Sequence, residues 1–166
     1  MTAQRAHKPT RNNRYAPRPV VRARVGLAMR RGMNFGTFGD AEPMIRAGGL
    51  ALAPISTGDA SLSVNGVTVL PTAQASDIDS GALKGLVLPG GTPDADGEAA
   101  VQALLQKARE KGVPVLAFGE GVVHAARAAG ADPADLLDVA AVLTDGAKVY
   151  PLADADAVTA AAGRIG

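Results

Sequence analysis

The sequence predicts an α/β protein with a doubly wound, mainly parallel sheet flanked by helices and with hairpins added at an edge. Short apolar runs alternate along the chain with segments of helical period, which is the pattern of strands joined by crossover helices. The 166 residues are 47% hydrophobic but only 3% aromatic, and small aliphatic side chains suit helices packed closely on a buried parallel sheet. Two turn dipeptides, Asn65-Gly66 and Asp145-Gly146, lie between strand-like runs and predict the hairpins.

Apolar periodicity and capping residues place the elements in order. We expect strands at residues 25–29, 50–55, 83–88 and 113–118, hairpins at 61–70 and 139–152, helices at 40–47, 94–111 and 155–164, and a helix running to residue 129 after the fourth strand. The longest helix is the clearest, because its apolar residues from Val101 to Ala108 follow the i, i+3, i+4, i+7 spacing. We expect Asp40 to cap the first helix and either Asp94 or Asp96 to cap the longest one.

The formal net charge of +1 hides a strong asymmetry. Residues 1–31 contain nine of the seventeen Lys and Arg residues and no acid, whereas residues 32–166 contain eight basic and sixteen acidic residues. We therefore divide the chain into a basic, proline-containing N-terminal arm, residues 1–23, and one α/β domain, residues 24–166. The positive charges assigned to the arm are Arg5, Lys8, Arg11, Arg14, Arg18, Arg22 and Arg24.

The arm is open to several interpretations. Its prolines and polar spacers fit a solubilising extension without regular structure. Its charge also suits contact with an acidic partner, either a protein or the phosphates of a nucleic acid, where Tyr15 could stack on a base. A third alternative is that the arm binds its own acidic domain or a sister subunit.

Composition excludes some kinds of chemistry. The chain has no cysteine, which excludes disulfides, thiolate metal sites and cysteine catalysis. No apolar run approaches the roughly 20 residues of a membrane span, and the first residues lack the apolar region of a secretory signal. We therefore expect a cytoplasmic protein that makes no membrane contact.

The fourth strand leads into the stretch around which we expect the chain to be organised. Residues 115–118 are apolar, and a helical pattern resumes after the turn Gly119-Glu120-Gly121. In α/β proteins the crevice beyond the carboxyl end of such a strand holds ligands, and a sharp strand-to-helix turn there carries nucleophiles. This turn has the form of a nucleophile elbow but contains no nucleophile.

These segments together resemble the ThiJ/PfpI family, within the class I glutamine amidotransferase-like group of flavodoxin-type folds. The resemblance covers about residues 24–166 and implies a flavodoxin-like sandwich that forms a homodimer. It rests on four segments in the right order, namely a first helix ending Arg46-Ala47-Gly48, the Asn65-Gly66 hairpin, a strand ending Leu88-Pro89-Gly90-Gly91, and the strand, elbow and helix of residues 113–130.

The chain departs from that family where the family's chemistry is located. Family enzymes resemble one another in a Cys-His-Gly elbow, and here those positions are Gly119, Glu120 and Gly121. The family's supporting glutamate aligns with Gly36. Because nucleophile, histidine and carboxylate are absent together, we expect a catalytically inactive binding, scaffold or assembly subunit. Glycine at position 119 would relieve the backbone strain that an elbow imposes on other residues.

Four residues remain candidates for a site. Glu120 could act as a general base or cation ligand in an enzyme of amidase, lyase or glyoxalase type, or it could simply lie at the start of the helix. His124 lies four residues later on the same helical face, where it could relay a proton with Glu120 or be a packed or surface histidine. Gly90 and Gly91 match the family's oxyanion-hole segment, or they form only a tight turn.

A cluster of acidic residues surrounds the strand ends. We interpret its members as turn and cap residues, with a divalent-cation site as the alternative. They are Asp77, Asp79, Asp94, Asp96 and Glu98. We expect neither a metal nor a cofactor.

Overall fold

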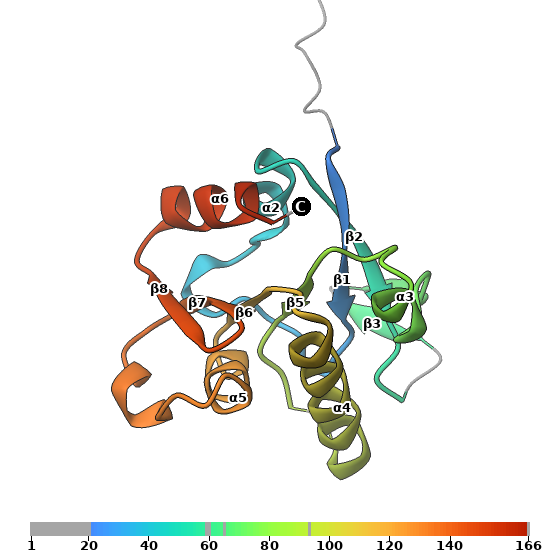
Figure 1. Cartoon of the computed structure of the whole chain (residues 1–166). Coiled ribbons are helices and arrows are strands. Elements are labelled where there is room, and N and C mark those ends of the chain that lie inside the picture. Colours follow the sequence, from blue (N-terminus) through green and yellow to red (C-terminus); the bar gives the residue numbers. More distant parts are fainter. Residues whose placement is uncertain (1–20, 59–60, 65, 93, 166) are drawn as a thin grey trace, which may run out of the picture.

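The computed structural model of the chain describes residues 21–58, 61–64, 66–92 and 94–165. Several residues discussed above lie outside the described ranges, namely Arg5, Lys8, Arg11, Arg14, Tyr15, Arg18 and Asn65. The described residues form a mixed α/β structure in which helices cover both faces of a central sheet (Figure 1). This confirms the fold class expected from the sequence.

The central sheet has six strands in the order β2-β1-β5-β6-β7-β8. These strands are β1 (Ala23–Ala28), β2 (Leu50–Ile55), β5 (Leu86–Leu88), β6 (Val115–Phe118), β7 (Ala141–Asp145) and β8 (Lys148–Leu152). The first four run parallel to one another, whereas β7 is antiparallel to β6 and β8 is antiparallel to β7. The strand order reverses between β1 and β5, so this end of the sheet has the switch point where α/β proteins form crevices.

Helices lie on both sides of the sheet. One face is covered by α3 (Ser76–Asp79), α4 (Ala95–Lys111) and α5 (Gly121–Ala128), and the other by α2 (Glu42–Ala47) and α6 (Ala155–Gly163) (Figure 1). Two 3-10 turns, η2 (Gly36–Phe38) and η3 (Pro133–Leu136), complete the described elements. In the part of the chain that the structure describes, no helix has the length and hydrophobicity needed to span a membrane.

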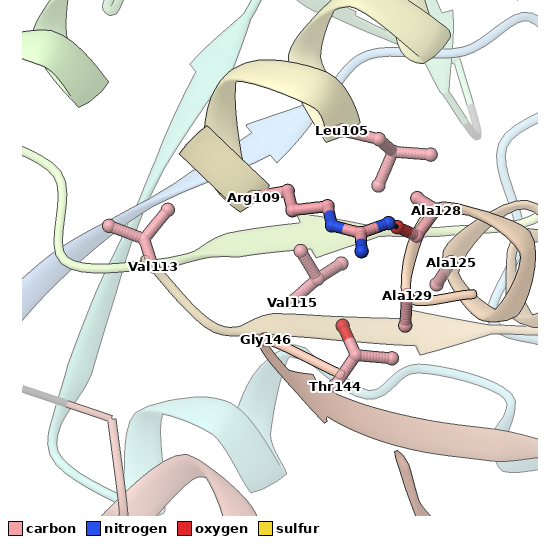
Figure 2. Close-up of a pocket in the computed structure, with 9 residues that line it drawn as sticks. All are labelled: Leu105, Arg109, Val113, Val115, Ala125, Ala128, Ala129, Thr144 and Gly146. Atoms are coloured by element: carbon pink, nitrogen blue, oxygen red, sulfur yellow. Dashed lines mark hydrogen bonds between the residues drawn. The ribbon is translucent and has the colours of Figure 1, made fainter. Parts of the chain in front are cut away.

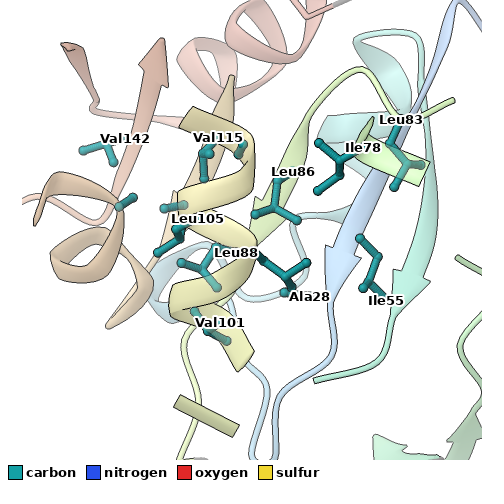
Figure 3. Close-up of a cluster of buried hydrophobic side chains, with 14 of the residues drawn as sticks. Ala28, Ile55, Ile78, Leu83, Leu86, Leu88, Val101, Leu105, Val115 and Val142 are labelled. Atoms are coloured by element: carbon teal, nitrogen blue, oxygen red, sulfur yellow. The ribbon is translucent and has the colours of Figure 1, made fainter. Parts of the chain in front are cut away.

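Aliphatic side chains fill the space between α4 and the sheet (Figure 3). Val101 and Leu105 of α4 pack in one cluster with Leu86 and Leu88 of β5, and all four are at most 2% exposed. The i, i+4 spacing of the two helix residues places them on one face, as the sequence pattern predicts. This packing holds β5 in the middle of the sheet, and its carboxyl end is therefore a rigid base for the segment that follows.

β1 begins earlier than expected, at Ala23. The Arg22 N–H donates a hydrogen bond to the Gly49 carbonyl at 2.8 Å, and Arg24 lies opposite Ala51 in the β1–β2 register. Arg22 and Arg24, which we assigned to the arm, are therefore attached to the sheet, because parallel pairing with β2 extends to this point.

The two hairpins differ in position. The β7–β8 hairpin extends the central sheet at one edge, as expected. The other, β3 (Leu62–Val64) with β4 (Val67–Val69), forms a separate two-stranded sheet, so its expected place at the sheet edge is wrong. At the outer side of β2, the Pro54 carbonyl instead accepts hydrogen bonds from Thr72 and Ala73. Proline has no N–H to continue a ladder, which limits further pairing there.

Helix boundaries follow the expected caps in part. Asp94 caps α4, with its Oδ1 accepting from the Gly97 N–H at 2.9 Å, and Gly112 ends the helix at φ 67°. Asp40 is not the N-cap of α2, because that position is Ala41. The Asp40 carboxylate instead accepts a hydrogen bond from the N–H of Glu42, the first residue of the helix. The short helix α3 was not expected, and the strand expected at residues 83–88 is shortened to β5.

Candidate functional site

The turn between β6 and α5 has the backbone expected of an elbow. Gly119 adopts φ 54°, in the left-handed region that side-chain-bearing residues rarely enter. Its N–H donates to the Ala140 carbonyl at 3.0 Å, and its carbonyl accepts from Val122 at 3.1 Å. Glycine adopts this conformation without the Cβ penalty that other residues would incur.

Gly121 is required for a different reason. A Cβ added to this buried residue would lie 2.6 Å from the Leu88 carbonyl oxygen and 3.0 Å from that of Pro89. The start of α5 therefore approaches the end of β5 more closely than any side chain allows. The two glycines of the elbow have separate roles, one in backbone conformation and one in packing.

The position aligned with the family's glutamate lies beside the elbow in space. A Cβ added to Gly36 would be 3.5 Å from the Gly119 Cα, and one added to Gly119 would be 3.8 Å from the Gly90 Cα. Three glycine backbones thus meet where the family places a thiol, a carboxylate and an oxyanion-binding segment. No side chain of these three residues can supply a reagent.

The segment after β1 closes over this meeting point. Asn34 and Gly90 form an isolated antiparallel bridge, in which Asn34 N–H donates to Gly90 O at 3.1 Å and Gly90 N–H donates to Asn34 O at 2.9 Å. The Asn34 Oδ1 accepts from the Gly36 N–H at 3.0 Å. The oxyanion role considered for Gly90 is therefore not supported, because its N–H is already engaged by Asn34.

Gly91 lies under the same segment. A Cβ on Gly91 would be 2.7 Å from the Arg31 carbonyl oxygen and 2.9 Å from the Arg30 Cβ. The next N–H, of Thr92, donates to that Arg31 carbonyl at 2.7 Å. Gly91 thus allows two backbones to approach closely, which is the turn interpretation of the Gly-Gly pair.

Aromatic rings pack against Phe118, the residue of β6 that precedes the elbow. Phe35 and Phe38 contact the fully buried ring of Phe118 edge-to-face, with centroids 5.1 and 5.7 Å apart. Such pairs stabilise by about 1 kcal/mol beyond the burial of their area. The glycine-rich segment of residues 33–39 is therefore held down on the end of β6.

Glu120 is exposed and does not cap the helix with its side chain. A Cβ added to Gly90 would collide with the Glu120 Oε2, so the carboxylate lies across the Gly90 backbone. Within the described residues, no hydrogen bond or ion pair holds this carboxylate. Glu120 therefore lies on the outside of the closed elbow rather than in an enclosed pocket.

His124 turns toward α4, which agrees with the packed histidine that the sequence offered as one alternative and not with the proton relay to Glu120. Its Nε2 lies 3.1 Å from Glu98 Oε2, and its Nδ1 lies 3.1 Å from Gln102 Nε2. The relay does not form because α5 packs along α4, so the helical face that carries the largely buried His124 side chain faces the neighbouring helix. Burial lowers the pKa of His124; the Glu98 carboxylate opposes this effect, while Arg30 and Arg127 add to it.

Arg30 was not singled out from the sequence and is the most buried charge described. Its side chain is 1% exposed, its Nη1 donates to the Pro89 carbonyl at 3.0 Å, and its Nη2 contacts Glu98 Oε1 at 2.5 Å. The Nε is buried without a partner. Glu98, which we interpreted as a turn or cap residue, thus links Arg30 to His124. The only sequence signal was an arginine directly after a buried strand.

The other acidic candidates serve turns, caps and ion pairs. Asp77 accepts from the Gln74 N–H, Asp79 pairs with Lys107 at 2.6 Å, and Asp94 pairs with Arg31 besides capping α4. Asp96 lies in the first turn of α4. Among the described residues, no three His, Asp or Glu side chains are grouped closely enough to hold a metal ion.

Neither of two cavities in the structure includes the elbow residues. One, of about 10 Å³, lies where α4 and α5 end, between Arg109, Val113 and Thr144 (Figure 2). It has room for roughly one water molecule. The other is a groove of about 490 Å³ beside β1 and β2. Glu120 and His124 line neither of them.

Comparison with known proteins places this fold. No protein-family model matches the sequence, and no curated protein matches it either. Among solved structures, oxidized DJ-1 from Toxoplasma gondii superposes with a TM-score of 0.57 at 17% identity, covering 84% of this chain and 86% of that one. A ThiJ/PfpI family protein from Pseudomonas syringae gives 0.53 at 15% identity, over 87% of this chain and 67% of that one.

A third similar structure is an AraC family transcriptional regulator from Pseudomonas putida, with a TM-score of 0.58 at 17% identity, over 84% of this chain and 88% of that one. These likenesses establish the fold alone. The chain has the fold shared by DJ-1 and ThiJ/PfpI proteins, which confirms the architecture that the resemblance implied.

Proposed function

We propose that this protein is a catalytically inactive ThiJ/PfpI-like protein that acts as a binding, scaffold or assembly subunit. The observation that carries the proposal is the closed elbow, in which Gly119 replaces the nucleophile and the Gly90 N–H is bonded to Asn34. Acyl transfer and related chemistry need a nucleophile, a base within hydrogen-bond reach and a free donor for the developing oxyanion. The described elbow does not bring these three groups together.

Glu120 is the remaining group on which an enzyme could be built. A carboxylate acts as general base only when a substrate can bind beside it and a partner orients or retains the proton. Glu120 is exposed, and the nearest histidine along its helix is bonded to Glu98 and Gln102. This separation favours the inactive interpretation over an amidase, lyase or glyoxalase that uses Glu120.

The experiment is an activity screen of the full chain and its Glu120→Gln variant on amide, ester and 2-oxoaldehyde substrates. We expect turnover of both proteins to be indistinguishable from that of a His124→Gln control and of buffer. An activity that the wild-type chain shows and Glu120→Gln abolishes would overturn the proposal. The Gln substitution keeps size and polarity at an exposed position, so loss of folding would not confuse the result.

Assembly is the second part of the proposal. We infer that the chain forms a homodimer in the cytoplasm and that the arm contacts an acidic partner; of its residues 1–23, Arg22 and Ala23 already belong to the sheet of the folded domain. The charge contrast supports this assignment, since residues 1–31 carry nine bases and no acid and the remainder carries sixteen acids. Light scattering of the full chain tests the dimer, and a monomer mass at micromolar concentration would contradict it. Fractionation of cells that express a tagged chain tests the location.

A further inference from the structure

The groove of about 490 Å³ lies on the side of the sheet covered by α2 and α6, beside the ends of β1 and β2. Its lining residues come from β1 and β2, from the segment between β1 and α2, from α2 itself and from the β3–β4 hairpin. The apolar lining residues are Leu27, Met33, Phe35, Leu52, Pro54 and Val69. Leu27 is buried and the other five are half-buried, so part of this apolar wall remains accessible in the described chain.

The rim of the groove is acidic. Asp40, Glu42 and Arg46 line it from the α2 side. Arg46 neutralises Glu42 through an ion pair of 2.6 Å, whereas Asp40 is exposed and has no ion-pair partner among the described residues. An occupant with apolar side chains and a positive charge would therefore complement both the lining and the rim.

The chain enters the folded domain next to this groove. The Arg22 Nη2 donates to the Gly48 carbonyl at 2.5 Å, and the Arg22 N–H donates to Gly49. Gly48 directly follows α2, and Arg46 on the groove rim lies in the last turn of that helix. Residues that precede Val21 consequently start within a few residues of one end of the groove.

The sequence before Val21 has the matching chemistry. Residues 14–20 read Arg-Tyr-Ala-Pro-Arg-Pro-Val, with two arginines among apolar side chains and two prolines. Prolines restrict the backbone, which reduces the entropy lost when such a segment is bound in a groove. Seven residues extend over roughly 22 Å in a polyproline conformation, a length of the order of the six-residue strands β1 and β2 beside the groove.

We propose that residues 14–20 of the same chain occupy the groove, with their apolar side chains on β1 and β2 and their arginines at the Asp40 rim. The inference rests on the proposed role of the arm as a binding segment and names its acidic partner as the groove of its own domain. A tethered segment acts at an effective concentration of order millimolar. The arm of the same molecule therefore has an advantage over a second copy at ordinary protein concentrations.

Introduced cysteine pairs test the inference directly, because the chain has no cysteine of its own. The variant Ala16→Cys with Val69→Cys, the groove pair, places one thiol in the segment and one in the groove. The matched control is Ala16→Cys with Leu137→Cys, since Leu137 is 77% exposed and lies beyond α5 on the opposite face of the sheet. A disulfide requires Cα atoms within about 7 Å. We expect intramolecular oxidation of the groove pair to be at least about tenfold faster than that of the control.

Other outcomes would overturn the inference. Equal rates for the two pairs would show that the arm does not occupy the groove, and disulfides between copies of the groove-pair variant would identify a second copy as the occupant. Asp40→Lys should slow the oxidation, whereas Asp135→Lys, an exposed acid remote from the groove, should not. Amide exchange supplies a measurement without groove substitutions, because deleting residues 1–20 should increase exchange at Leu52. No increase would contradict docking.

These results are separable from the proposed function. Failure of the disulfide and exchange tests would leave an inactive subunit with a free arm. Turnover that depends on Glu120 would overturn the inactive assignment without changing the rate of disulfide formation. The two proposals therefore cannot fail through the same observation.

Discussion

The elbow lies at the same end of the sheet as the Arg30 network, which consists of Arg30, Glu98 and His124. The two regions differ in how their charged side chains are buried and paired. At the elbow, glycine backbones and phenyl rings fill the space, and the single acid, Glu120, is exposed without a partner in the described residues. A few residues away, Arg30 is buried and bonded to Pro89 and Glu98, which also contacts His124. The contrast shows that the buried Arg30 and its partly buried partners Glu98 and His124 connect the segment after β1 to α4 and α5, and that they do not surround the position of a nucleophile.

The largest effect that can sharpen this comparison is expected from Arg30→Ala. The change removes the cation from Glu98 and the donor from the Pro89 carbonyl, and it leaves a cavity. Losing a buried side chain together with its hydrogen bonds should lower the free energy of unfolding by about 3 kcal/mol. Urea unfolding measures it, with Arg46→Ala as the control, because its ion pair with Glu42 is exposed. A loss no greater than that of the control would show that the network does not hold the helices to β1.

Gly121→Ala should have the next largest effect. The added methyl would lie 2.6 Å from the Leu88 carbonyl oxygen, so α5 must move away from β5. Overpacking of this kind costs about 2 kcal/mol. The same unfolding measurement checks it, and a neutral result would mean that the start of α5 shifts without cost.

Gly119→Ala should cost about 1 kcal/mol, from its backbone conformation alone. A Cβ at this position would meet nothing closer than the Asn34 Oδ1 at 3.5 Å, which is an ordinary contact. Gly112→Ala is the matched control, because Gly112 has φ 67° and ψ 27°, in the left-handed helical region, and an added Cβ there meets no atom within 4 Å. Equal losses from the two variants would support strain as the cause, whereas a much larger loss at 119 would indicate steric conflict at the elbow.

The smallest effect is a pH dependence carried by His124. Burial holds its pKa below the ordinary value of 6.5 in the folded protein. Between the lowered pKa of the folded protein and the ordinary pKa of the unfolded chain, the unfolded chain binds more protons at this residue. The free energy of unfolding therefore falls as the pH is lowered through that range. His124→Gln should make the free energy of unfolding decline less steeply below about pH 6.5 than it does for the wild-type chain. Parallel curves for the two proteins would contradict this account.

The sequence allowed parts of the site to be predicted because they depend on local backbone chemistry. Glycine at 119 and 36, next to apolar strands and a helical pattern, predicted an elbow without a reagent. Contacts between side chains of different helices and strands were harder to predict from the sequence. The i, i+4 relation of Glu120 and His124 was a sound helical argument, yet α4 packs beside α5 and supplies Glu98 instead. The bond between Asn34 and Gly90 joins residues 56 positions apart, and no local pattern signals it.

By itself the sequence determined most of the order of strands and helices, a cap for the longest helix at either Asp94 or Asp96, and the absence of any thiol, because periodicity, capping and composition are properties of neighbouring residues. Only the tertiary structure decided that β3 and β4 stand apart from the main sheet, that Arg30 is buried with Glu98, and that Asn34 closes the elbow. Contacts of this kind depend on which surfaces meet when the elements pack, and packing relates residues that are distant in the chain.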